Sequence, residues 1–232
     1  MSVFTIRGIY ICSLNDEIYE KILFITKSKK FLEFIDLLNS KDNLKNIILR
    51  INNASWYYEP NPENLGFLYM ELFALDKQNN NPVSDIIILR CENIAIYLRV
   101  IFNNKKYVVL TKQLNVPVGT DTLEIIPGIM DENKNILIMK EININELTEN
   151  KLISLGDYFP NSNYCVECIK LFYFEININE EQFNKFQGNT YSNDNKIILI
   201  PDDEYEDILK NIKDEKTIFA HNFAKDKKLL NT

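Results

Sequence analysis

The chain has 232 residues, of which 46% are hydrophobic and 25% are charged, and its formal net charge is −7. This length and composition fit one or two globular domains with a sizeable core. The acidic balance argues against general binding to nucleic acid, which needs clustered Lys and Arg. No apolar run reaches the length of a transmembrane helix, and the N-terminus lacks the plan of a signal peptide. We therefore predict a cytoplasmic protein that binds neither nucleic acid nor membrane and keeps its cysteines reduced.

Residues 1–92 are predicted to form a small N-terminal domain. Apolar side chains at helical spacing indicate one or two helices, and runs of β-branched and aromatic residues between Pro- and Asn-rich turns indicate strands. No catalytic constellation occurs among them, so the expected role is accessory or dimerising. The predicted elements are a strand at 4–12, helical residues between 18 and 38, and strands at 47–58, 65–75 and 83–91.

Residues 93–232 mix strands and helices, which predicts an α+β fold or a mixed-sheet sandwich. The stretch 107–128 combines a β-branched strand, a loop with Pro117 and Gly119, and a second strand ending in Pro127-Gly128. Residues 136–147 are ambiguous, because their Ile and Asn content suits a helix poorly. The other expected elements are strands at 94–102, 165–178 and 196–200 and helices at 180–186, 203–212 and 215–230.

Generic catalytic and metal motifs are weak in this sequence. Cys165 and Cys168 form a C-x-x-C, but a structural zinc site needs a second Cys pair or two His ligands. His221 is the single histidine, and any Ser-His-Asp triad would have to use it. We predict that it is a surface or capping residue of the last helix. No Gly-rich phosphate loop is present.

Three segments in register carry a resemblance to a known family. Residues 107–132, with Lys112-Gln113, Val116-Pro117 and Glu124 to Gly128, are similar to the run that precedes the catalytic helix in ADP-sugar pyrophosphatases of the Nudix superfamily, the plant type above all. Residues 160–172 resemble a downstream family segment around Cys165 and Glu167, and the strands before residue 91 match the family's β-rich N-terminal region in order. The resemblance therefore covers nearly the whole chain.

The resemblance implies a Nudix-like α/β/α sandwich with a mixed sheet, preceded by a smaller N-terminal β-rich domain. It also implies a nucleotide-sugar ligand, Mg²⁺ if the protein is active, and a homodimer through the N-terminal domain or a protein complex. The substrate-binding residues carried over are Gln113, Glu124 and Gly128, and Glu167 is a catalytic candidate.

The metal-binding helix of the family departs from its pattern here. A Nudix box reads G-x5-E-x7-R-E-U-x-E-E-x-G-U, and its three clustered carboxylates hold Mg²⁺ against a diphosphate. With Gly128 as the first glycine, Ile142-Asn143-Ile144 replaces R-E-U in the ungapped register. A three-residue insertion keeps Glu146 and Glu149 at i, i+3, whereas a two-residue deletion leaves Glu141 alone. No register restores the full set.

Three hypotheses remain open. In the first, the chain is a Nudix-fold protein with impaired or lost catalysis that acts as a binding or scaffolding module. In the second, it is an active Mg²⁺-dependent nucleoside-diphosphate-sugar hydrolase with a rearranged carboxylate site. In the third, it is another α+β module. For the second hypothesis, Glu146 is the leading catalytic candidate with Glu167, and the candidate metal ligands are Glu146, Glu149 and Glu141, with Glu124 and Glu132 behind them.

Overall fold

The computed structural model divides into two compact units. One unit contains Met1–Cys91 and Phe159–Glu167, and the other contains Glu92–Tyr158 and Cys168–Thr232. The structure describes residues 3–56, 59–90, 93–115, 119–130, 136–138, 151–160, 165–188, 190–192 and 195–230.

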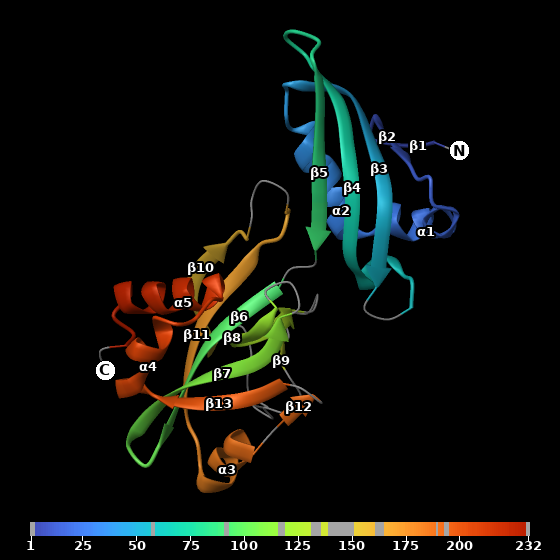
Figure 1. The fold of residues 1–232 in the computed structure, drawn as a ribbon. Coiled ribbons are helices and arrows are strands. Elements are labelled where there is room, and N and C mark those ends of the chain that lie inside the picture. The colour runs from blue at the N-terminus through green and yellow to red at the C-terminus, as the bar shows by residue number, and fades with distance from the viewer. Residues whose placement is uncertain are drawn as a thin grey trace. The chain divides into compact units, whose positions relative to one another are not determined.

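The first unit is a sheet with two helices on one face (Figure 1). Among its described residues the strands lie in chain order, with β2 and β3 parallel and the other neighbours antiparallel. A buried apolar cluster lies between this sheet and the helices. The elements are β1 Phe4–Ile6, β2 Ile9–Cys12, α1 Asp16–Lys27, α2 Lys29–Asn39, β3 Leu44–Trp56, a short 3₁₀ turn at Pro62–Asn64, β4 Leu65–Asp76 and β5 Pro82–Arg90.

Local sequence signals set the boundaries of these elements. The predicted strand at 4–12 is instead a hairpin, because Arg7 and Gly8 both adopt positive φ, as a tight two-residue turn requires. The helical region consists of two helices because Ser28 is extended: it ends α1, and its hydroxyl accepts from the Phe31 N–H at the start of α2. The strands predicted from 47, 65 and 83 are confirmed as β3, β4 and β5.

A later stretch of the chain also packs in the first unit. The Val166 N–H donates to the Ile88 carbonyl at 2.8 Å, and Cys165 forms a parallel bridge with Ile88. Val166 lies against the apolar cluster of this unit. This packing places Glu167 in the first unit.

The second unit is built on a larger mixed sheet. Among the described residues the strand order is β10-β11-β6-β8-β7-β13-β12, and β9 pairs with β8. Only β11 and β6 run parallel among these described pairs. The strands are β6 Asn93–Phe102, β7 Lys105–Asn115, β8 Thr120–Met130, β9 Ile136–Ile138, β10 Ile153–Tyr158, β11 Ile169–Asn177, β12 Thr190–Ser192 and β13 Asn195–Pro201.

Helices cover both faces of this sheet, which confirms the predicted layered α+β sandwich. One buried cluster joins the sheet to α4 (Asp202–Leu209) and α5 (Glu215–Asp226) through Tyr205, Ala220 and Ala224. The opposite cluster joins it to α3 (Glu180–Gly188) through Phe186. Among the described residues, no helix has both the length and the apolar character needed to cross a membrane.

Several predicted boundaries in this unit shift. The hairpin between residues 94 and 111 is confirmed, and its turn is narrowed to Asn103 and Asn104, both at positive φ. The strand expected from 165 begins at Ile169, and the last helix ends at Asp226 instead of residue 230. The strand β10 was not anticipated. The ambiguous stretch from 136 contributes β9, and residues 139–147 lie outside the described residues.

Candidate functional site

The predicted approach segment forms the β7–β8 pair, and β8 changes partners along its length. Residues Thr120 to Ile125 pair with β7, whereas Ile126 to Ile129 pair with β6. At the point of divergence the Ile125 N–H leaves the ladder and donates to the Thr217 Oγ1 of α5 at 2.8 Å. The first turn of α5 therefore contacts β8 at the point where its partner changes from β7 to β6.

Where β8 pairs with β7, the two strands carry a row of polar side chains on one face. Thr111 pairs with Glu124, and Gln113 pairs with Thr122. By strand alternation these residues continue the positions of Val109 on β7 and of Ile126 on β8, which belong to the core under α3. Thr111, Thr122 and Glu124 are buried and Gln113 is half-buried. Along this face of the sheet, the apolar side chains of the core therefore give way to buried and half-buried side chains that can form hydrogen bonds.

Glu124 is held in this row by several donors. Its Oε1 accepts from the Thr122 hydroxyl at 2.8 Å, and its Oε2 accepts from the Lys216 ammonium at 2.6 Å. Burial favours the neutral acid, but Lys216 and the hydrogen bonds from Gln113 and Thr122 outweigh it, so the pKa of Glu124 lies below its ordinary value. Glu124 is thus a buried carboxylate that remains ionised.

Lys216 is shared between two carboxylates. Its Nζ also contacts Asp214 Oδ1 at 2.6 Å, and its side chain is 16% exposed. Burial opposes the charge, but Asp214 and Glu124 raise the pKa of Lys216 above its ordinary value. Asp214 caps α5 as well, because its other oxygen accepts from the Thr217 N–H at 3.0 Å. These ion pairs join β8 to the start of α5.

Of the three predicted binding residues, the structure places Gln113 and Glu124 near each other and Gly128 further along β8. Gln113 and Glu124 are brought to the same face of the β7–β8 pair, where Gln113 contributes to lowering the pKa of Glu124. Gly128 lies on the same strand, between Ile94 of β6 and Ile138 of β9 in the ladder. Both oxygens of Glu124 already have protein donors, so a ligand contacting Glu124 would share it with Lys216. That these three residues bind a substrate stays a prediction.

Glu167, the catalytic candidate of the first unit, is also engaged by protein groups. Its side chain is 7% exposed and its Oε2 lies 3.7 Å from the Arg90 guanidinium. The Cys165 thiol lies 3.7 Å from the same oxygen, and burial raises the pKa of this thiol. Cys12, Cys165 and Cys168 are free thiols.

The remaining metal candidates, Glu132, Glu141, Glu146 and Glu149, lie outside the described residues. Within the described part of the chain, no cluster of three or more His, Cys, Asp or Glu side chains could hold a metal ion. Glu124 fits a Mg²⁺ ligand poorly, because the Lys216 ammonium already neutralises it. The described residues therefore do not fit a magnesium site.

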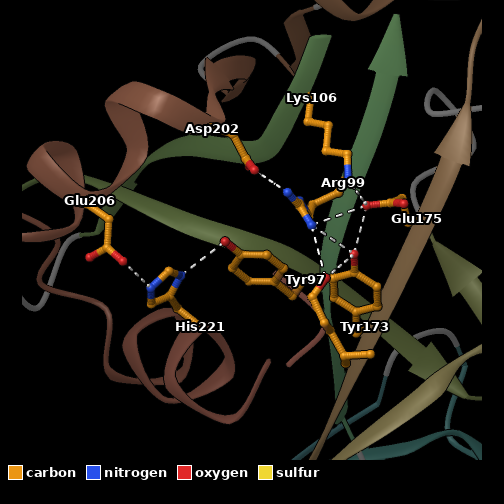
Figure 2. Close-up of polar contacts among 9 residues, drawn as sticks. Tyr97, Arg99, Lys106, Tyr173, Glu175, Asp202, Glu206 and His221 are labelled. Carbon is orange, nitrogen blue, oxygen red and sulfur yellow. Dashed lines mark hydrogen bonds and ion pairs between the residues drawn. The ribbon is translucent and has the colours of Figure 1, made fainter. Parts of the chain in front are cut away.

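A buried network on the opposite face of the sheet was not predicted (Figure 2). Arg99 of β6 is fully buried and forms ion pairs with Asp202 of α4 and with Glu175 of β11, the latter at 3.2 Å. Its Nη1 also donates to the Tyr173 hydroxyl at 3.2 Å and to the Leu229 carbonyl at 3.1 Å. One guanidinium thus joins two strands, α4 and the segment that follows α5.

His221 lies in this region, and the prediction of a surface residue was wrong. Its side chain is 4% exposed, its Nε2 is 3.2 Å from Glu206 and its Nδ1 is 3.1 Å from the Tyr97 hydroxyl. Burial lowers the pKa of His221, although Glu206 acts in the opposite direction. The ring of Tyr205 also packs against it, at 5.3 Å between centroids. His221 is a core residue that joins α5 to the sheet.

One of these features had a signal in the sequence. Arg99 interrupts an apolar run from Ile94 to Ile101, and a charge inside a buried strand needs a partner. Nothing local identifies Lys216, because its partner Glu124 is 92 residues away.

The comparisons with known proteins give one informative sequence match. The chain matches no protein-family model. It is similar to the protein named Nudix hydrolase 14, chloroplastic, of Arabidopsis thaliana, with 24% identity over 177 residues. The match covers 67% of this chain and 56% of that relative. A solved structure described as an ADP compounds hydrolase aligns over 76% of this chain and 91% of its own, with 11% identity and a TM-score of 0.49.

Proposed function

We propose that the second unit is a Nudix-related domain that binds a nucleoside-diphosphate compound, an ADP-sugar above all, and has lost most or all hydrolytic activity. One observation carries the proposal: β7 and β8 form the hydrogen-bonding row containing Gln113 and Glu124, which are residues of the Nudix-like approach segment. The similarity to Nudix hydrolase 14 supports the same relationship.

The reduced activity follows from the carboxylates. The register that retains most of the box leaves Glu146 and Glu149 as the carboxylates at its metal-binding positions, without the Arg and the third Glu. Mg²⁺ in phosphate chemistry is held by several oxygens, and it stabilises the charge that develops at the phosphorus. Glu124 is a poor substitute ligand because it is committed to Lys216. Weak metal binding removes most of the rate enhancement while leaving ligand binding intact.

A binding screen tests the proposal. Titration calorimetry with ADP-ribose, ADP-glucose and UDP-glucose, with Mg²⁺ or with EDTA, should show saturable binding of an ADP compound that persists in EDTA. Replacing Gln113 with Ala should weaken binding roughly fivefold, because one hydrogen bond is lost. Gln78→Ala, in an exposed turn of the other unit, is the matched control. The absence of binding by all three compounds would contradict the proposal.

We also propose that the first unit mediates self-association through the outer face of its sheet. On this face Tyr10, Ile48 and Phe73 lie side by side in the strand register, at 48%, 39% and 38% exposure. The neighbouring row holds the ion pair Arg50–Glu71. Large apolar side chains gathered on one sheet face are typical of an interaction surface.

The oligomeric state tests this second proposal. Light scattering after size exclusion should give a dimer for the wild type and a monomer for Phe73→Ser. The control is Phe219→Ser, which changes a similarly exposed Phe of the second unit. A monomeric wild type, or equal mass for both variants, would contradict it.

A further inference from the structure

Lys216 lies at a place where a lysine is not expected. It stands in the first turn of α5, at the end where the helix dipole is positive and a further positive charge is unfavourable. Its side chain is also largely buried, and lysines are rarely buried unless a partner compensates their charge. The contacts of the Lys216 ammonium, and not a preference of the helix, therefore account for its position.

Two carboxylates from different elements hold this ammonium. Glu124 Oε2 on β8 and Asp214 Oδ1 at the start of α5 each lie 2.6 Å from Lys216 Nζ. Because both oxygens are this close to one nitrogen, they are near enough to each other to share a single metal ion at ligand distances of about 2.0–2.6 Å. The ammonium thus occupies the position of a cation that bridges two carboxylates.

The protein fixes the second oxygen of each carboxylate. Glu124 Oε1 accepts from the Thr122 hydroxyl at 2.8 Å. Asp214 Oδ2 accepts from the Thr217 N–H at 3.0 Å. These contacts orient both carboxylates without the help of Lys216, so the same two oxygens would still converge if another cation replaced the ammonium.

We propose that Lys216 is a built-in cation that occupies a divalent-metal position between Glu124 and Asp214 and excludes a metal ion from it. Mg²⁺ and Mn²⁺ favour carboxylate and water oxygens, and Mg²⁺ is commonly held by one or two carboxylates with water completing its shell. The tethered ammonium competes with such ions at a high effective concentration. A ligand beside Glu124 would therefore meet a fixed ammonium instead of a metal ion; this consequence rests on the function proposed above, whereas the cation position does not.

Manganese binding tests the proposal, because the paramagnetic resonance signal of free Mn²⁺ falls when a protein binds the ion. The full chain with Lys216→Met should bind one more Mn²⁺ than the wild type, since Mn²⁺ bound elsewhere contributes equally to both proteins. At about ten times its dissociation constant, Mn²⁺ should raise the melting temperature of this variant by about 4 °C.

Two control variants separate the metal position from general charge effects. Lys216→Met/Asp214→Asn keeps a side chain that can cap α5 but removes one carboxylate, so it should bind the additional Mn²⁺ about tenfold more weakly or worse. Lys210→Met removes the same charge from an exposed pair with Asp207 and should bind Mn²⁺ as the wild type does.

Equal numbers of bound Mn²⁺ in the wild type and in Lys216→Met would overturn the proposal and leave Lys216 with a purely structural role. Equal Mn²⁺ affinity with and without Asp214→Asn would overturn it too. If Lys216→Met is unfolded without metal, Mn²⁺ should restore its far-UV circular dichroism, because metal binding is then coupled to folding. A failure of Mn²⁺ to restore it would contradict the proposal. None of these measurements uses a nucleotide, so their outcome is separate from that of the ligand screen.

Discussion

The ion pair that joins β8 to α5 gives the most informative stability prediction. Replacing Lys216 with Met keeps an unbranched side chain of similar length but removes the charge. The change leaves the carboxylates of Glu124 and Asp214, which are 7% and 14% exposed, without their shared cation. Both would then have to stay ionised in a poorly hydrated place or take up protons.

The expected cost is large. Removing one partner of a buried ion pair destabilises a protein by about 3–5 kcal/mol, because the remaining charge is uncompensated. At roughly 3 °C per kcal/mol for a domain of this size, the melting temperature of the second unit should fall by roughly 10–15 °C. The double variant Lys216→Met/Glu124→Leu should recover part of this loss, because it removes one of the stranded carboxylates.

The deficit should depend on pH in a defined direction. The pKa of Glu124 in the folded protein lies below its ordinary value, so its ionisation stabilises the fold above the carboxyl pKa of the unfolded chain, about 4.3. This contribution is lost as the pH falls through the folded pKa. The difference between wild type and Lys216→Met should therefore be full at pH 7 and smaller below about pH 4.

Urea unfolding with two probes tests this prediction. The single tryptophan, Trp56, ends β3 in the first unit, so its fluorescence reports that unit, whereas far-UV circular dichroism reports both. Lys216→Met should shift the circular dichroism transition and leave the Trp56 transition in place. The control is Lys210→Met, which breaks an exposed pair with Asp207. If Lys216→Met were as stable as Lys210→Met, the reasoning would be refuted.

Three further predictions concern the face of the second unit's sheet that packs against α4 and α5. Arg99→Met should lower the unfolding free energy by about 3 kcal/mol, because Asp202 and Glu175 lose their buried partner but stay partly hydrated. Urea titration measures this loss, and a loss below about 1 kcal/mol would contradict the prediction. The pKa of His221 is lowered, so its neutral form stabilises the fold above about pH 6.5, and this stability is lost as the pH falls. His221→Gln should therefore lose less unfolding free energy than the wild type between pH 7.5 and 5.5. The same dependence of the unfolding free energy on pH in both proteins would contradict this prediction. Gly156 has a φ of +145°, so Gly156→Ala should cost about 1 kcal/mol or more by thermal melting, and an unchanged melting temperature would contradict the strain.

The strands and helices that could be predicted are those with a local signal. Runs of β-branched and aromatic residues indicated β3 to β7, and the polar turn at Asn103 and Asn104, both at positive φ, closes the hairpin between β6 and β7. The strand β10 has Gly156 in its middle and a register shift against β11, so its sequence carries little alternation. Its pairing with β11 stabilises it, and single-sequence patterns do not reveal such non-local pairing.

The candidate site shows the same contrast between local sequence signals and non-local partners. The polar residues of β7 and β8 could be named because they lie in one continuous segment. Their partners could not, because Lys216 is 92 residues from Glu124 and His221 is 124 residues from Tyr97. The prediction that His221 lies on the surface is wrong because Tyr97 and Tyr205 provide a mixed aromatic and polar environment that accepts a histidine.

Hydrolysis of ADP-ribose with excess enzyme tests the central claim most directly. The protein is incubated with ADP-ribose and Mg²⁺ at concentrations where calorimetry shows it to be bound, and AMP release is followed by chromatography. Wild type, Glu146→Gln and Glu149→Gln should all bind the compound and release AMP no faster than a protein-free control. Metal-dependent AMP release by the wild type that either substitution abolishes would contradict the claim and identify an active hydrolase.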